Sequence, residues 1–374
     1  MDFDFSDDQA QLRDAVRKWV DKSYGFDDRR QRVAEGGFSQ ASYQAMAELG
    51  LTGLWVQEAY GGMGMGPVDA MVAMEELGRG LLLEPLAHAW IASAVLQGFA
   101  PETLRQTWLP RIASGDALVV LAHQERGARH DFRACKTQAT QVNGQWQLSG
   151  HKSLVPAGDK ASAWLVPAMA QGQLALFLVG AGQGADTRHH YAAQDGSRMA
   201  ELKLSQAAGE LLSTQGLEAL SLALDVGIAA LCAESVGLME KTLAVTVDYM
   251  NTRRQFGVPI ASFQALQHRV ADMKMQLELG RSMSYYATLK LHAPAQERRL
   301  AVSRAKYQMG RATRHIGQEA VQLHGGIGVT DEYIISHCFK RLTQMELTFG
   351  DSLHHLAEVS AGMQETAEIG RAHV

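Results

Sequence analysis

Cysteine is scarce in this sequence. The three cysteines, Cys135, Cys232 and Cys338, lie far apart and form no Cys-x-x-Cys motif. An odd, scattered set excludes a disulfide-stapled secreted scaffold and is typical of a reducing cytosol. Metal-ligand spacing is absent as well, because the adjacent histidine pairs at 189–190 and 354–355 have no Cys or Asp cluster beside them. The sequence therefore predicts a cytoplasmic protein that binds no metal.

We expect no targeting segment, and the sequence has neither a long uncharged apolar run nor an excess of positive charge. Its acidic residues 1–8 resemble neither a secretory signal nor a transit peptide. The most apolar stretch, 217–239, contains Glu218, Asp225 and Glu234, so we expect a buried helix and no membrane span. The net charge of −5 gives no general attraction to nucleic acid or to an anionic membrane. An anionic ligand must therefore be held by local positive groups.

The 374 residues are enough for two or three domains, and the sequence pattern changes twice along them. Residues 1–115 carry helical signals, residues 116–212 carry short β segments, and residues 213–374 return to helical signals. The expected order is therefore a helical domain, a small β domain and a second helical domain.

Start and stop signals place several of the expected helices. The segment Ser6-Asp-Asp-Gln9 is a capping box, and Ser39 is the expected N-cap of a second helix. Pro67 follows a glycine loop and is expected to begin another helix. In the last domain, Ser262 is the expected N-cap of one helix, and Gly325-Gly326 is expected to end the next.

Short apolar segments with turn residues between them characterise the middle domain. The strongest hairpin signal of the chain is Asn143-Gly144, which lies between two alternating segments. Further strands are expected at 119–121, 164–166, 174–179 and 201–204. Several short strands of this kind predict a small sandwich or barrel.

One segment, Thr252-Arg-Arg-Gln-Phe-Gly-Val-Pro-Ile260, places two arginines at the end of a long helix. Such a pair can hold a phosphate through charge-assisted hydrogen bonds, or it can simply complement the negative end of the helix. Taken alone, the segment favours the second interpretation.

Together with its neighbours, this segment resembles the flavin-binding helix-turn-helix of the acyl-CoA dehydrogenase family. The matching segments are 253–257, 263–268, 271–273, 322–333, 48–54 with the glycine loop after it, and 75–79. The resemblance covers essentially the whole chain. It implies an α+β multidomain fold with an N-terminal helical domain, a middle β-barrel or sandwich and a C-terminal four-helix bundle. The segment Phe349-Gly-Asp-Ser-Leu-His-His355 looks like the small-subunit type of pimeloyl-CoA dehydrogenase-like proteins.

The resemblance implies FAD as cofactor, held between the β domain and the C-terminal helices with a neighbouring subunit completing the site. Arg253 matches the arginine that meets the FAD pyrophosphate, Phe256 the aromatic residue beside it, and Gln264 a glutamine of the same site. Gln322 and Gly326 match residues that reach the adenine end across a dimer.

Three further positions are implied by the same resemblance. Ser352 and His354 match positions of the cofactor site near the flavin. Asp225 matches an aspartate that contacts the pantetheine arm of CoA, although a lone aspartate in an apolar helix is equally well a polar group of the core.

The catalytic segment departs from the family pattern. The family reaction needs a carboxylate to remove the substrate α-proton while the flavin takes a β-hydride. The usual Tyr-Glu-Gly-Thr is replaced here by Phe349-Gly-Asp-Ser352, so Gly350 stands at the base position, and the alternative position on the long helix matches Gly227. Gly350 could still offer its backbone N–H to the thioester oxygen. Asp351 is the nearest carboxylate, and a structural role at a helix start competes with its use as a base.

The middle domain departs from the pattern too. Leu154-Val-Pro156 stands where the family has Trp-Ile-Thr beside the flavin ring, and Gln124-Glu-Arg-Gly127 replaces Thr-Glu-Pro-Gly. The ADP half of the expected FAD site is therefore better preserved than the isoalloxazine half.

Three functions are compatible with these features. The first is α,β-dehydrogenation of an acyl-CoA, with an electron-transfer flavoprotein or similar acceptor, by a homodimer or tetramer or beside a paralogous subunit. The second is a catalytically silent partner of an active paralogue. The third is a base-free flavoenzyme such as a desulfinase or monooxygenase. For the first function we expect Gly350→Glu to raise the rate unless crowding prevents it.

Overall fold

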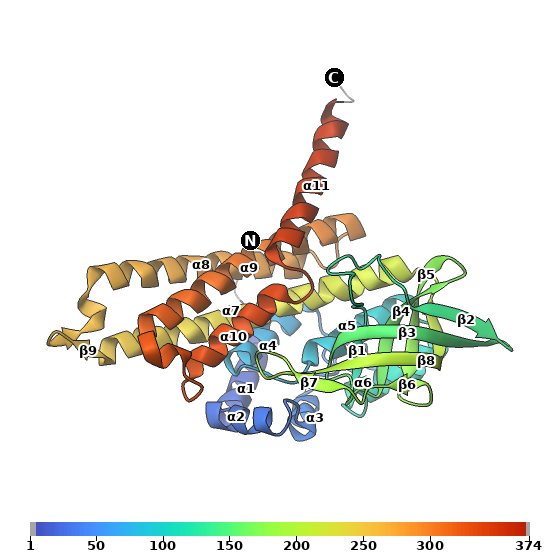
Figure 1. Cartoon of the computed structure of the whole chain (residues 1–374), viewed down its shortest axis with the longest axis horizontal. Coiled ribbons are helices and arrows are strands. Elements are labelled where there is room, and N and C mark those ends of the chain that lie inside the picture. Colours follow the sequence, from blue (N-terminus) through green and yellow to red (C-terminus); the bar gives the residue numbers. More distant parts are fainter. Residues whose placement is uncertain (1–4, 372–374) are drawn as a thin grey trace. The chain divides into compact units, whose positions relative to one another are not determined.

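The computed structural model describes the backbone of residues 5–371 and the side chains of residues 5–363 (Figure 1). The first four residues of the acidic N-terminus lie outside the described part. The chain forms two compact units. One consists of Met1–Phe26, Met71–Leu82 and Ile228–Val374, and is called the helical unit below; the other consists of Asp27–Ala70 and Leu83–Gly227, and is called the β unit. The expected domain boundaries at 115/116 and 212/213 stay a prediction.

The helical unit is built from long helices. They are α1 (Asp7–Ser23), the larger part of α4 (Pro67–Arg79) and of α7 (Gly216–Thr252), α8 (Gln264–Leu289), α9 (Ala295–His324), α10 (Ile334–Leu347) and α11 (Ser352–Arg371). Helix α9 packs against α8, α10 and α11, and α11 projects from the bundle (Figure 1). The expected C-terminal helical bundle is therefore present.

Glycine allows α4 and α7 to cross closely within this unit. A Cβ atom on Gly78 would lie 2.1 Å from the Glu234 carbonyl oxygen, and one on Gly237 would lie 1.7 Å from the Glu75 carbonyl oxygen. Each helix therefore presents a glycine to the backbone of the other, and a larger residue at either position would push the helices apart. The apolar helix α7 is long enough to cross a membrane, but almost all of its most apolar stretch is buried inside the protein, as expected for a core helix.

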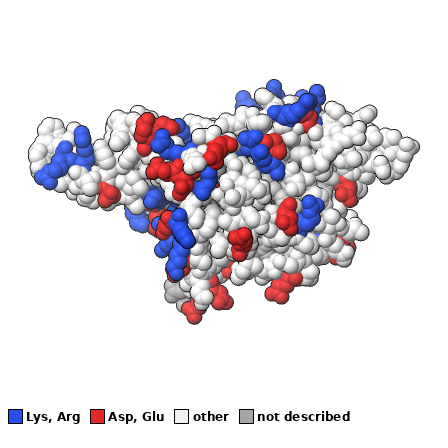
Figure 2. All heavy atoms as spheres, turned by 90° about the horizontal axis from the view of Figure 1, so that it is seen from below, with Lys and Arg blue, Asp and Glu red and all other residues white. Residues whose placement is uncertain are grey.

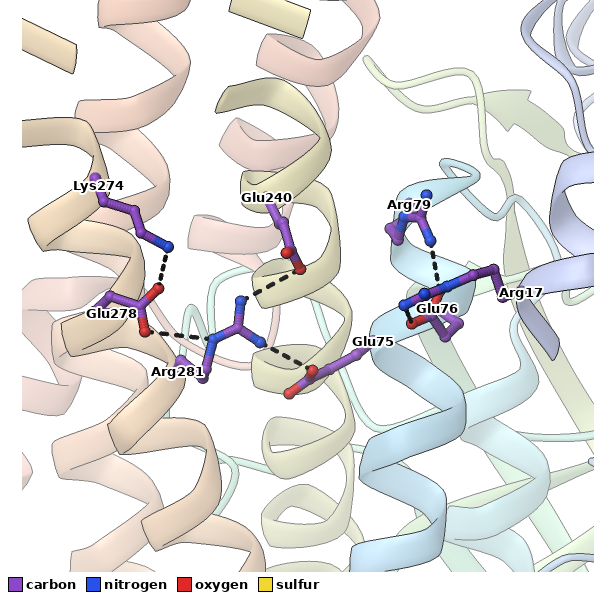
Figure 3. Close-up of polar contacts among 8 residues, drawn as sticks. All are labelled: Arg17, Glu75, Glu76, Arg79, Glu240, Lys274, Glu278 and Arg281. Atoms are coloured by element: carbon purple, nitrogen blue, oxygen red, sulfur yellow. Dashed lines mark hydrogen bonds and ion pairs between the residues drawn. The ribbon is translucent and has the colours of Figure 1, made fainter. Parts of the chain in front are cut away.

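Charged side chains connect four helices of the helical unit (Figure 3). Arg281 of α8 lies 3.2 Å from Glu75 of α4 and 3.3 Å from Glu240 of α7. Arg17 of α1 pairs with Glu76 of α4 at 2.6 Å. Burial raises the pKa of Glu75 to about 7 even though Arg281 opposes the shift.

The raised pKa of Glu75 predicts a pH-dependent effect of Glu75→Gln. The carboxyl group ionises near pH 4.5 in the unfolded chain and near pH 7 in the native protein, so the native state holds the extra proton in between and stability falls as pH rises through this window. Glutamine has no such penalty, and Arg281 keeps Glu240 and Glu278. We expect Glu75→Gln to raise the free energy of unfolding by about 1–2 kcal/mol at pH 8 and to leave it nearly unchanged at pH 5.

Urea unfolding at both pH values measures this effect. Glu240→Gln, which removes a mostly exposed carboxylate from the same network, is the control and should change stability by less than about 0.5 kcal/mol. A Glu75→Gln variant that is equally destabilised at pH 5 and pH 8 would contradict the assignment.

The β unit combines short helices with a closed barrel. Its helices are α2 (Phe26–Ala34), α3 (Gln40–Glu48), η1 (Glu58–Tyr60), α5 (Leu86–Phe99) and α6 (Glu102–Ala113). Its strands are β1 (Val119–Leu121), β2 (Gln138–Val142), β3 (Gln145–Pro156), β4 (Ala163–Ala170), β5 (Gln173–Gly180), β6 (Ala185–Asp186), β7 (His190–Ala192) and β8 (Arg198–Ser213). Pairing runs from β4 through β2, β3, β8 and β5 back to β4, which closes the ring. The expected barrel is therefore present.

Local signals placed most elements correctly. The Asn143-Gly144 turn connects β2 to β3, with both residues at positive φ as a tight hairpin turn requires. The Ser6 hydroxyl accepts a hydrogen bond from the Gln9 backbone N–H, and the Ser6 backbone N–H donates to the Gln9 side chain, so the capping box is confirmed. The predicted N-cap at Ser262 is wrong. Helix α8 begins after Phe263, and the Ser262 hydroxyl donates to the Pro259 carbonyl inside a preceding 3₁₀ turn, η2 (Ile260–Ser262).

Candidate active site

A short exposed hairpin connects α7 to α8 and carries two of the expected cofactor residues. Arg253 leads into β9 (Arg254–Gln255), which pairs with β10 (Val258–Pro259). The turn residues Phe256 and Gly257 both have positive φ, and 90% of the Phe256 surface is exposed. The Phe256 ring meets the Phe263 ring edge-on, with 6.2 Å between centroids, so most of its surface is available to a ligand or a partner. Figure 2 shows basic side chains gathered at this end of the chain.

The other residues matched to the ADP end lie at the same end of the bundle. Gln264 is the exposed first residue of α8, and Gln322 is exposed near the end of α9. The last turns of α7 and α9 adjoin, because the Tyr249 ring stacks on His324 at 4.3 Å and its hydroxyl donates to the His324 carbonyl. A Cβ on Gly326 would meet nothing within 4 Å, so this backbone is open to a ligand.

The expected catalytic position lies in the turn between α10 and α11. Phe349 and Gly350 both have positive φ, 60° and 110°. The buried ammonium of Lys306 on α9 holds this turn by donating to the carbonyl oxygens of Met345, Glu346 and Gly350 at 2.8–3.0 Å. The sequence reasoning missed Lys306. Its signal is a lysine on a helix face that is otherwise made of buried small and apolar residues.

Gly350 has no room for the side chain that the family places there. A Cβ atom would lie 2.6 Å from Cδ2 of His354 and 2.8 Å from Nε2 of His355. His355 is fully buried, with its ring nitrogens 3.2 Å from the Ser303 hydroxyl and 3.1 Å from the Phe349 carbonyl. Burial, with the charges of Lys306 and Arg299, lowers the pKa of His355 to about 2, so this ring is neutral. Gly350→Glu was expected to raise the rate of dehydrogenation unless crowding prevents it. The two histidines provide that crowding.

The residues after Gly350 are engaged in starting helix α11. The Asp351 carboxylate accepts a hydrogen bond from the His354 backbone at 2.8 Å, as an N-cap residue does. Ser352 donates its backbone N–H and its hydroxyl to the buried Glu346 carboxylate, at 3.0 and 2.9 Å. Asp351 therefore has the structural role of capping α11, which competes with its use as a base. The proposed cofactor roles of Ser352 and His354 stay predictions.

The structure does not bring the two groups of site residues together within one chain. The hairpin group lies where α10 begins, and the Gly350 group lies where it ends; the 14 residues of α10 measure about 21 Å between them. Asp225 is completely buried in the part of α7 that belongs to the β unit, as is Gly227. The assignment of Asp225 to the pantetheine arm stays a prediction.

In the β unit, the segment matched to the flavin ring adjoins a polar cluster. Leu154 has positive φ and is 48% exposed, and the Ser153 N–H donates to the Gln124 carbonyl at 2.9 Å. Glu201 of β8 lies nearby, 2.7 Å from the His151 imidazole and 3.1 Å from the Tyr191 hydroxyl. The sequence reasoning missed this cluster because its members come from three strands. Within the described residues, no group of three or more Cys, His, Asp and Glu side chains could hold a metal ion.

The comparisons with known proteins agree with this architecture. Two family models match the chain, "Acyl-CoA dehydrogenase, N-terminal domain" over residues 6–116 and "Acyl-CoA dehydrogenase, C-terminal domain" over residues 214–364. Together they cover more than half of the sequence. The chain belongs to the acyl-CoA dehydrogenase family.

Individual relatives cover almost the whole chain. The probable acyl-CoA dehydrogenase YngJ of Bacillus subtilis is 29% identical in an alignment 371 positions long, which covers 94% of this chain and 97% of that protein. One chain of the ChsE4-ChsE5 complex from Mycobacterium tuberculosis has a TM-score of 0.89 and 25% identity, over 98% of this chain and 99% of the other. A chain from the study of the electron transferring flavoprotein of Acidaminococcus fermentans has a TM-score of 0.90 and 26% identity, over 97% and 99%. The narrower likeness to pimeloyl-CoA dehydrogenase small subunits is not tested by these matches.

Proposed function

We propose that this chain binds FAD and acts in the α,β-dehydrogenation of an acyl-CoA thioester, with no carboxylate at the usual base position. We further propose that it needs a second subunit, either a copy of itself or a paralogue, to complete the cofactor site. The single observation that carries the proposal is the preserved hairpin end, where the side chains of Arg253 and Phe256 are exposed. Electrons would pass to an electron-transfer flavoprotein or a similar acceptor in the cytoplasm.

The residues present fit the phosphate-bearing half of FAD. Arg253 offers a planar guanidinium to a pyrophosphate, Phe256 an exposed ring, and Gly326 an open backbone. Gln264 and Gln322 offer side-chain amides at the same end of the bundle. When bound, FAD supplies acceptance of a hydride from the substrate.

The distance between the hairpin group and the Gly350 group supports the need for a second subunit. The hairpin end and the Gly350 turn lie at opposite ends of α10, so a second chain offers a way to bring one group to the other. The match to a chain of the ChsE4-ChsE5 complex supports a paralogous partner, since that structure contains two different chains.

The chain's own residues would act on the substrate through the Gly350 turn. The turn is fixed by Lys306 on one side and by His355 on the other, so the backbone N–H of Gly350 can be held in place as a donor to a thioester oxygen. No side chain at this position takes up the α-proton. The lone chain should therefore dehydrogenate acyl-CoA slowly, because loss of a positioned base typically costs about 10²–10⁴-fold in rate.

A second candidate function is a silent partner that lends its hairpin to an active paralogue. It is favoured by the filled space at Gly350, where the contacts to His354 and His355 leave no room for a catalytic side chain. Anaerobic titration of the purified chain with acyl-CoA thioesters separates the two functions. Bleaching of bound flavin, even slow, supports the dehydrogenase, whereas FAD uptake without bleaching supports the silent partner. A protein that takes up no flavin on reconstitution contradicts both.

Arg253→Ala should weaken FAD binding. Loss of one charge-assisted phosphate contact corresponds to roughly 1.5–3 kcal/mol, which is about a 10- to 150-fold increase in the Kd for FAD. Flavin fluorescence quenching during reconstitution of the apoprotein measures this change. Arg254→Ala is the matched control, because it removes the same charge one residue along and should change the Kd by less than about threefold. If both variants raised the Kd for FAD equally, only the general positive charge of the hairpin would contribute to FAD binding.

A further inference from the structure

The thiol of Cys135, which lies just before β2, contacts a buried ammonium group. The Lys152 side chain of β3 is fully buried, and its Nζ donates to the Cys135 sulfur at 3.6 Å. The carboxylate of Glu125, which follows β1, lies 2.7 Å from the same ammonium and 3.5 Å from the sulfur. Three segments of the β unit thus bring together a thiol, an amine and a carboxylate, and the function proposed above uses none of them.

Hydrogen bonds fix the thiol in this position. The Glu125 carboxylate accepts from the backbone N–H groups of Lys136 at 2.7 Å and Thr137 at 3.1 Å, and from the Thr137 hydroxyl at 2.7 Å. The Cys135 thiol also donates to the Pro167 carbonyl oxygen of β4 at 3.3 Å. Because the two residues after Cys135 are held by the same carboxylate that binds the amine, the sulfur and the nitrogen stay close, and a reaction between them requires little further ordering.

Solvent access distinguishes Cys135 from the other two cysteines. Its side chain is half-buried, whereas those of Cys232 and Cys338 are fully buried in the helical unit. A small oxidant dissolved in water therefore reaches Cys135 more readily, and the oxidation of cysteine follows solvent access as well as the fraction of thiolate. The two buried cysteines provide an internal reference for an oxidation experiment.

The surroundings of the sulfur keep the thiol protonated at neutral pH. Burial raises the pKa of the Cys135 thiol, and the Glu125 charge adds to the rise although Lys152 opposes it. The reactive thiolate is therefore a minor species, and oxidation becomes faster as pH rises. Burial alone would raise the pKa of Glu125, but hydrogen bonds from Lys152 and Thr137 lower it to about 2. The carboxylate is thus unprotonated while the ammonium is charged, and it can take up a proton once the nitrogen becomes neutral.

We propose that hydrogen peroxide oxidises Cys135 and that the product forms a reversible sulfur–nitrogen bond with Lys152. In the first step the O–O bond of the peroxide breaks, a sulfenic acid forms on the sulfur, and water leaves. In the second step the Lys152 nitrogen attacks the sulfur, the S–O bond breaks, and hydroxide leaves. The nitrogen gives up two protons, of which Glu125 takes one and the hydroxide takes the other to form water. The sulfur loses two electrons, and the peroxide is reduced to water.

The sulfur–nitrogen bond replaces a buried ion pair by a neutral covalent link between the segment before β2 and β3. Sulfenic acids condense with nearby nitrogen atoms in this way, and the reaction needs no cofactor of the protein itself. A thiol reductant reopens the link, because a thiolate attacks the sulfur and releases the amine. The inference is independent of the proposed function, since none of the three side chains belongs to the hairpin group or to the Gly350 group.

Peptide mapping of the full-length protein, as purified and then freed of reductant, tests the proposal. After treatment with hydrogen peroxide and digestion with trypsin, we expect the peptides that contain Cys135 and Lys152 to be joined, with a mass two hydrogen atoms below their sum. Dithiothreitol should separate them. Oxidation of Cys135 should be at least about 10-fold faster than that of Cys232 or Cys338, and about 10-fold faster at pH 8 than at pH 7, because the thiolate is the reactive form.

Controls in the same experiment separate this bond from unspecific oxidation. Cys135→Ser should abolish the joined peptides, and protein unfolded in urea should be oxidised at Cys135 without joining it to Lys152. Lys136 is the matched lysine, because it is exposed and adjacent to Cys135 in sequence. Oxidation of Cys135 in the folded protein without joined peptides, or joining to Lys136 in place of Lys152, overturns the proposal. Failure of the protein to take up flavin would contradict the proposed function and would leave this bond unaffected.

Discussion

Replacing Lys306 by methionine should lower the free energy of unfolding by about 3–5 kcal/mol. The variant leaves the carbonyl oxygens of Met345, Glu346 and Gly350 without their buried donor, and each unsatisfied buried polar group costs about 1–3 kcal/mol before relaxation. Methionine fills a volume similar to that of lysine, so the loss of stability measures the missing hydrogen bonds and does not include the cost of a cavity. The α10–α11 turn should also lose its fixed conformation, because Lys306 joins it to α9.

Urea unfolding and hydrogen exchange at residues 348–352 measure both effects. Burial lowers the pKa of Lys306 to about 8, so between about pH 8 and pH 10.5 the unfolded chain holds a proton that the native protein has released. The unmodified protein should gain stability with rising pH in that window, and Lys306→Met should lack this gain. Lys340→Met, a half-buried lysine of α10 near Asp331, is the control and should change stability by less than about 1 kcal/mol. A Lys306→Met variant as stable as the control would show that the turn does not depend on this lysine.

Gly350→Glu should destabilise the protein and fail to produce a fast dehydrogenase. Gly350 has a φ of 110°, and a side chain there meets His354 and the buried His355. Backbone strain of this kind costs about 1–3 kcal/mol, and overpacking adds about 1–3 kcal/mol. Gly350→Ala carries the same strain without a carboxylate and should be destabilised to a similar extent. Comparing the unfolding curves and the flavin reduction rates of the two variants therefore distinguishes the effect of crowding, which both share, from the effect of the carboxylate, which only Gly350→Glu has.

Asp351→Asn completes this series. Asparagine is as good an N-cap as aspartate, so the start of α11 should be preserved while the carboxylate is removed. We expect the rate of flavin reduction to change by less than about threefold, because the Asp351 side chain caps the helix. A fall of 100-fold or more would show that Asp351 is the base. A fast, folded Gly350→Glu variant would show that His354 and His355 move aside.

The fold could be predicted largely from local signals. The capping box at Ser6, the hairpin at Asn143-Gly144 and the helix end at Gly325 each depend on a few neighbouring residues, and all three are confirmed. Ser262 failed as an N-cap because its hydroxyl has a competing acceptor in the preceding turn. The closure of the barrel depends on which strands meet, which no local pattern specifies.

The candidate site was less predictable because its contacts join distant segments. Lys306 meets a turn about 40 residues further along the chain, and Lys152 of β3 meets Glu125 of the loop after β1. The motif comparison shows that Gly350 stands where the family has glutamate. Why glycine suits this position is visible only in its positive φ and in the two histidines around it. The hairpin residues were found because their sequence pattern is compact, with Arg253 and Phe256 only three positions apart.

The central claim, that the lone chain lacks a catalytic base at Gly350, is tested most directly by the anaerobic rate of flavin reduction. The purified chain, reconstituted with FAD, is mixed with saturating acyl-CoA in a stopped-flow instrument, in parallel with a family member that carries Tyr-Glu-Gly-Thr and with that member's Glu→Gly variant. We expect this chain to match the variant, about 10²–10⁴-fold slower than the parent enzyme. A rate equal to that of the parent, in the absence of any other subunit, would contradict the account.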